Sequence, residues 1–134
     1  MTALSTYAEL KILDLLFKNT SYTSPNAYIG AFTSDPTDSA SGTECSGSGY
    51  ARVQIDNKTS SASAGADNSS ITNSSAITFP AASGGAWGTV THIGIFDASS
   101  SGNLLAHGAL AASKVISDGD VLQLNASSLV ITID

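Results

Sequence analysis

The last third of the chain constrains the fold most strongly. From Trp87 to Asp134 the sequence consists of short runs of β-branched, aromatic and aliphatic residues, each ending at Gly, Ser, Asn or Asp. Because these residues tolerate tight turns, the pattern predicts short strands joined by turns. Similar runs upstream extend it to a mainly β fold, an antiparallel β-sandwich or a small, jelly-roll-like barrel. The expected strands are 27–33, 50–55, 76–79, 89–96, 103–110, 114–116, 121–124 and 128–133.

Segment 89–96 is the strongest strand candidate, because it is apolar on both faces near its end. We expect it at the centre of a sheet, in a hairpin with 103–110. His92 and His107 lie in these two strands, so the two histidines could come close together if the strands pair as a hairpin. A zinc site needs three or four ligands, and the single cysteine lies far away in a loop. We therefore expect no metal and no cofactor here.

Residues 5–18 form the one predicted helix. Thr6 and Glu9 have the spacing of a capping box at its start. The apolar residues that follow are spaced by three and four, which gives the helix an apolar stripe of Leu10, Leu13 and Phe17, widened by Ile12 and Leu16. The favoured interpretation is a helix packed across its own sheet. The alternative is a helix docked partly on a neighbouring subunit, which makes the first three of these residues candidate interface residues.

Trp87 is the only tryptophan, and glycines lie on both sides of it. It has two interpretations of equal weight. The side chain either anchors the edge of the sheet or contacts another subunit, since tryptophan is enriched at interfaces. Trp87 is therefore a further candidate interface residue.

The chain is expected to form a single domain over residues 1–134. Residues 34–49 have the composition of a loop. Residues 56–75 consist mostly of Ser, Ala, Asn and Gly, and they are expected to form a flexible loop because they bury too little apolar area to offset the entropy of ordering. A neighbouring surface would be needed to order them.

The charge pattern disfavours two classes of partner. Only 12% of the residues are charged, the net charge is −6, and the five basic residues are scattered. Nucleic acids and anionic membranes both require clustered basic residues, so neither is an expected partner. No signal peptide is recognisable and no run approaches the roughly 20 apolar residues of a membrane span. We expect synthesis and folding in a cytosol.

No recognisable catalytic arrangement is present. Asp35, Asp38 and Glu44 lack the alternating spacing of a calcium-binding loop. The glycine-rich stretch 46–49 has neither the following Lys-Ser/Thr of a phosphate loop nor the context of a nucleophile elbow. Cys45 is expected to be an ordinary free thiol. The sequence therefore predicts a protein that is not an enzyme.

Five motifs stand out along the chain, at residues 4–17, 31–36, 49–52, 76–80 and 87–97. Together they resemble a family of small virion proteins of tailed bacteriophages, often called phage tail fibre or structural proteins. The resemblance covers nearly the whole chain, its most specific part is the block 87–97, and 56–75 corresponds to a variable region. It implies no catalytic residues.

Within such a virion, we expect a capsid cement or decoration protein that stabilises the shell by protein–protein contacts. The expected partners are further copies of the chain, as a homotrimer, and the major capsid protein. A fibre normally needs a repetitive stalk, and this chain has no repeat and no extended heptads. The alternative is a structural or host-binding module of the tail fibre or baseplate.

Overall fold

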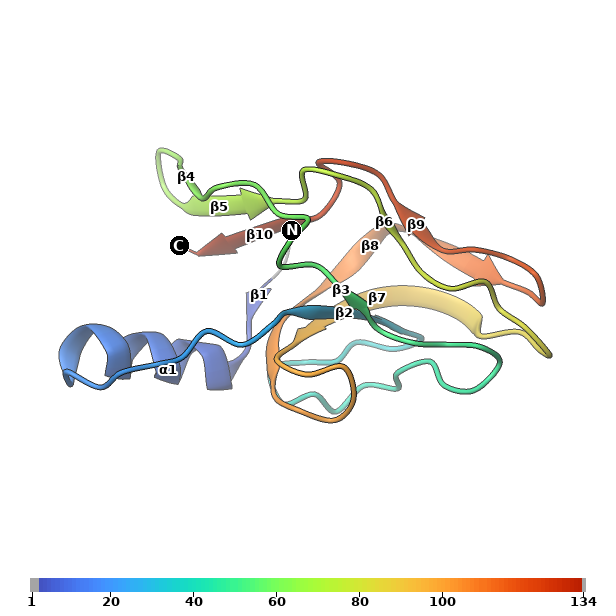
Figure 1. Ribbon diagram of the computed structural model, residues 1–134, viewed down its shortest axis with the longest axis horizontal. Helices are drawn as coiled ribbons and strands as arrows, with labels where there is room; N and C mark the ends of the chain where they lie inside the picture. Colours follow the sequence, from blue (N-terminus) through green and yellow to red (C-terminus); the bar gives the residue numbers. More distant parts are fainter. Residues whose placement is uncertain (1–2, 134) are drawn as a thin grey trace.

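A computed structural model describes residues 3–133 as a mainly β protein with three antiparallel sheets and an N-terminal helix (Figure 1). The sheets do not close into a barrel, and the architecture is that of a β-sandwich, as predicted. The described elements are β1 (Ala3–Leu4), α1 (Thr6–Phe17), β2 (Tyr28–Phe32), β3 (Val53–Gln54), β4 (Ser63–Ala64), β5 (Ser69–Thr72), β6 (Ile77–Thr78), β7 (Gly88–Phe96), β8 (Leu104–Ile116), β9 (Gln123–Leu124) and β10 (Val130–Ile133).

The largest sheet has five strands in the order β1-β8-β7-β2-β3, so the predicted central position of β7 is confirmed. The predicted hairpin between β7 and β8 is also confirmed. Its turn is closed by the Asp97 carboxylate, which accepts hydrogen bonds from the backbone N–H and the side-chain amide of Asn103 at 2.6 and 2.8 Å. Gly102 has a φ of +76° within this turn, a conformation that favours glycine.

Strand β8 is longer than the sequence predicted, because segments 103–110 and 114–116 belong to one continuous strand. The register shifts between them. Val90 faces Lys114 while His92 faces Ala109, so an irregularity in β8 absorbs the Ala-rich residues in between. Both predicted segments can therefore pair with β7.

The predicted loop over 56–75 contains two short strands. Strand β5 pairs with both β4 and β10, and these three form a small sheet. The expectation of a loop is therefore wrong for residues 63–64 and 69–72. The surface that orders them belongs to the same chain, since β10 supplies the backbone partners.

The main core lies on one face of the five-stranded sheet and includes residues from β6 and the segments preceding β9 and β10. Ile29, Ile77 and Val90 are completely buried in it. Strand alternation places a second, smaller cluster of Phe32, Phe96 and Leu104 on the opposite face. Gly94 lies beneath this cluster, where a Cβ atom would come within 3.0 Å of all three side chains.

Candidate interaction surface

The start of α1 is fixed to strand β8. Ser5 is the N-cap residue, and its Oγ accepts a hydrogen bond from the Ala8 N–H at 3.2 Å. The Ser5 hydroxyl donates to the Leu104 carbonyl, and the Ser5 N–H donates to the Leu105 carbonyl at 2.9 Å. The predicted capping box is wrong, because the N-cap is Ser5 rather than Thr6. The helix therefore begins one residue earlier than that motif requires, and Glu9 is at the fourth helical position rather than the third.

Helix α1 ends where the sequence predicted, with Lys18 as its C-cap residue. The Lys18 N–H donates to the Asp14 carbonyl at 3.1 Å, and the Thr20 hydroxyl donates to the same carbonyl at 2.6 Å. Asn19 adopts a φ of +51°, a conformation that commonly terminates helices. These contacts stop the helix before it reaches β2, and a long connecting segment follows.

Helix α1 has two apolar faces. The inner face consists of Ala8, Ile12 and Leu15, which line a cavity of about 240 Å³ together with Leu105 and the connecting segment that follows the helix. The outer apolar face consists of four large side chains that remain in solvent. Their exposed fractions are 57% for Leu10, 53% for Leu13, 65% for Leu16 and 77% for Phe17.

The favoured interpretation, a helix packed across its own sheet, is wrong for this stripe. Helix α1 contacts β8 and β1 near its start and then extends away from the end of the sheet (Figure 1). Of its residues only Ala8 is buried. The predicted residues Leu10, Leu13 and Phe17 are brought together on one face, and Leu16 adjoins them.

Trp87 lies apart from this surface, inside the protein's own core, with 7% of its area exposed. Its ring meets Tyr50 and Phe79 edge-on, at centroid distances of 5.1 and 6.2 Å. Its indole N–H donates to the Ser48 carbonyl at 3.1 Å. These contacts agree with the interpretation of Trp87 as an anchor of the sheet.

A partly buried ion pair between Arg52 and Glu44 lies beside the β7–β8 turn, and sequence reasoning did not identify it. The Arg52 guanidinium binds both carboxylate oxygens of Glu44 at 2.7 Å. It also donates to the Ala98 and Ser101 carbonyls at 2.9 and 2.7 Å and lies 3.5 Å from the centroid of the Phe96 ring. No local pattern links these residues, although Arg52 belongs to a motif of the family resemblance.

Tyr50 completes this ion-pair network. Its hydroxyl donates to Glu44 Oε1 at 2.7 Å and accepts the Ala31 N–H at 2.9 Å. Burial raises the pKa of the Tyr50 phenol well above its usual range, and the neighbouring Glu44 carboxylate raises it further. The phenol is therefore a permanent hydrogen-bond donor, and the network serves the fold.

The acidic residues singled out in the loop do not converge on a common site. Glu44 binds Arg52, whereas Asp35 and Asp38 face His107. His92 pairs with Ala109 and His107 pairs with Gly94, two steps apart along the β7–β8 ladder, so the two histidines lie on one face of the sheet. Within residues 3–133, no group of three or more His, Cys, Asp or Glu side chains is arranged to hold a metal ion.

Two further findings bear on reactivity and membrane contact. Cys45 is buried in the main core, and this burial raises the pKa of its thiol, which disfavours the reactive thiolate. In the described part of the chain, α1 is far too short to serve as a membrane-spanning helix.

The comparisons with known proteins agree with the resemblance seen in the motifs. A family model described as "Podophage GP4 fiber I protein gp80" matches residues 3–132, nearly the whole chain. No curated protein matches the sequence at a significant level. The expectation of a structural protein family of tailed phages is confirmed.

Proposed function

Since the chain belongs to the family of Podophage GP4 fiber I protein gp80, we propose that it is a structural subunit of a phage fibre that acts by binding other protein surfaces. The observation that supports this most directly is the outer apolar face of α1, four large apolar side chains exposed side by side. Contiguous exposed apolar patches are uncommon on soluble monomers and often mark interaction sites.

The proposed occupant of this face is a further copy of the chain, as part of a homotrimer. Leu10, Leu13 and Phe17 follow each other at i, i+3 and i+7, the spacing of the apolar seam between associating helices. A specific interface buries about 800 Å² on each partner, so the helices would form the centre of a larger contact.

The other proposed partners are virion proteins. The basic side chains are too few to form a nucleic-acid or membrane surface, and Arg52 is already engaged by Glu44. We propose assembly into the virion after synthesis in the cytoplasm of the host bacterium.

We also propose that the protein performs no catalysis. The side chains that could do chemistry are engaged in structure: His107 with two carboxylates, Tyr50 with Glu44, and Cys45 in the core. A nucleophile activated by a neighbouring base is not found among these contacts.

Capsid decoration is the second candidate. It is favoured by the compact sandwich and by a surface of low charge, since a decoration protein needs only to cover the shell with many weak contacts. A host-binding module is a variant of the fibre role and would use the same fold.

Copy number and position in purified virions separate the two candidates. We expect quantitative mass spectrometry to give a low copy number that matches the fibres. We also expect antibody labelling in electron micrographs to decorate the tail. Hundreds of copies spread over the head would instead establish decoration, and absence from the particle would refute both roles.

A further inference from the structure

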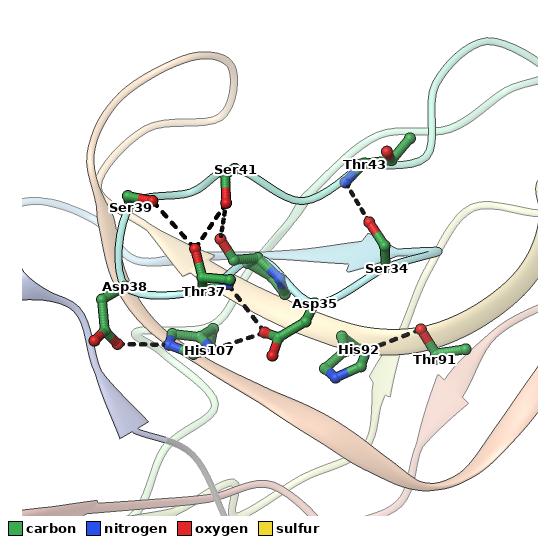
Figure 2. Close-up of polar contacts among 11 residues, drawn as sticks. Ser34, Asp35, Thr37, Asp38, Ser39, Ser41, Thr43, Thr91, His92 and His107 are labelled. Atoms are coloured by element: carbon green, nitrogen blue, oxygen red, sulfur yellow. Dashed lines mark hydrogen bonds and ion pairs between the residues drawn. The ribbon is translucent and has the colours of Figure 1, made fainter.

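A loop formed by residues 33–44 lies against the face of the sheet that carries both histidines (Figure 2). His107, on β8, has a carboxylate oxygen near each ring nitrogen. Its Nε2 lies 2.9 Å from Asp38 Oδ1, and its Nδ1 lies 3.4 Å from Asp35 Oδ1. The imidazole is 12% exposed, whereas both carboxylates are largely in solvent.

The loop has an internal framework that keeps the two carboxylates in place. The Thr33 N–H donates to the Thr43 carbonyl at 2.9 Å, which closes the base of the loop. The Ser41 N–H donates to the carbonyl of Pro36, a fully buried residue, at 2.7 Å. The Thr37 N–H donates to Asp35 Oδ1 at 2.9 Å. The loop therefore presents both aspartates to His107 as one unit.

The protonation state of His107 decides how many of these contacts are favourable. A neutral imidazole donates from one nitrogen and carries a lone pair on the other, whereas an imidazolium donates from both. With a carboxylate oxygen at each nitrogen, only the imidazolium satisfies both positions. In the neutral form one carboxylate faces a lone pair.

We propose that His107 is a proton-operated latch that holds the loop 33–44 against β8 when its imidazole is protonated and loosens the loop when the imidazole is neutral. Histidine is the side chain that ordinarily changes charge between about pH 5 and 8, which suits it to a proton-dependent contact of this kind. The latch is independent of whether α1 binds a second copy.

Asp35 and His92 are titratable groups that also act on this contact. Asp35 has its pKa lowered, chiefly by the hydrogen bond from the Thr37 N–H and also by the charges of His92 and His107. A lowered carboxyl pKa means that the contact is present above the ordinary aspartate range and is lost only in stronger acid. His92, on β7, contacts the Thr91 hydroxyl through Nδ1 at 2.8 Å and acts on Asp35 only through its charge.

Amide hydrogen exchange measured by NMR tests the latch through the N–H groups of Thr37, Ser41 and Thr43. Protection factors, which correct for the intrinsic pH dependence of exchange, should be about two- to fivefold higher near pH 5.5 than near pH 7.5, the scale of exposed ion pairs. His107→Gln keeps a side-chain amide that can donate a hydrogen bond but cannot become charged, so it should abolish this difference. The matched control His92→Gln should retain it.

Three results would overturn the latch. The wild type could show equal protection factors at the two pH values, or His107→Gln could keep the wild-type difference. The third is that His92→Gln loses the difference while His107→Gln keeps it. If His107→Gln fails to fold, Asp38→Asn at an exposed loop position decides the question. That variant should show a smaller step, and an unchanged step would refute the latch.

Discussion

Single residues in this protein bind together segments that lie far apart in the sequence. Arg52 is the clearest case, because its guanidinium makes four hydrogen bonds to three different residues and covers the Phe96 ring. The bidentate pair with Glu44 has a geometry that lysine cannot reproduce. The residue therefore fastens the β7–β8 turn to the segment before β3.

Replacing Arg52 with Lys should lower the free energy of unfolding by about 1 to 3 kcal/mol, since lysine cannot keep the bidentate pair with the partly buried Glu44 and the bond to the Ala98 carbonyl. Urea unfolding followed by circular dichroism measures this. Lys18→Met removes an exposed ion pair with Asp14 and should change stability by no more than about 0.5 kcal/mol. Equal effects of the two variants would contradict the structural role of Arg52.

Asn73 has a similar role at the end of β5. Its side chain is fully buried, donates to the Ser75 and Asn125 carbonyls at 2.9 and 2.8 Å, and accepts the Leu129 N–H at 2.9 Å. It thereby fastens the segment before β10 to the segment after β5.

Asn73→Ala should cost about 2 to 4 kcal/mol of unfolding free energy, because it leaves buried backbone groups without partners. Asn73→Asp should cost at least as much, since a carboxylate cannot donate to the two carbonyls. Thermal unfolding monitors both variants. Asn26→Ala, at an exposed loop position, is the control, and a comparable loss there would show that the assay reports something other than buried hydrogen bonds.

Helix α1 is the element with the clearest functional potential, because its two apolar faces have different surroundings. The inner face lines a cavity over its own chain, although Leu15 at its edge is still 47% exposed, whereas the outer apolar face lies in solvent. An element that owes little stability to its outer residues can accept polar substitutions there without unfolding.

The double variant Leu13→Gln, Phe17→Gln should therefore remain folded but self-associate at least about tenfold more weakly, because apolar anchors at an interface often contribute more than 1.4 kcal/mol. Sedimentation velocity gives the dissociation constants. Val115→Gln, which removes another exposed apolar side chain from β8, should leave association intact. A wild-type chain that stays monomeric at high concentration would rule out self-association through α1.

At the scale of the whole molecule, association and stability are linked. If copies bind only in the folded state, the melting temperature should rise by a few degrees for each tenfold increase in protein concentration. Differential scanning calorimetry over a concentration series measures this. The melting temperature of the Leu13→Gln, Phe17→Gln variant should not depend on concentration, and a wild-type melting temperature that is equally constant would argue against an oligomer.

The apolar face of α1 was predictable from the sequence, but its position relative to the sheet was not. The spacing of Leu10, Leu13 and Phe17 is visible in the sequence and correctly indicates one apolar face. Whether that face meets its own sheet depends on where Ser5 attaches the helix to β8, which no local pattern reveals. Trp87, singled out for its residue type, is buried for an equally non-local reason: Tyr50 and Phe79 surround it.

The sequence by itself determined the β class, the central strand with its hairpin, the existence of one helix and the family. All of these follow from periodicity, turn residues or motifs within short stretches of chain. Only the tertiary structure decided which face of α1 stays in solvent, that the polar segment 69–72 is a strand, and that Arg52 and Asn73 hold distant segments together. The physical reason is that backbone pairing and burial between distant segments depend on their three-dimensional arrangement, as when β10 supplies partners to residues about sixty positions earlier.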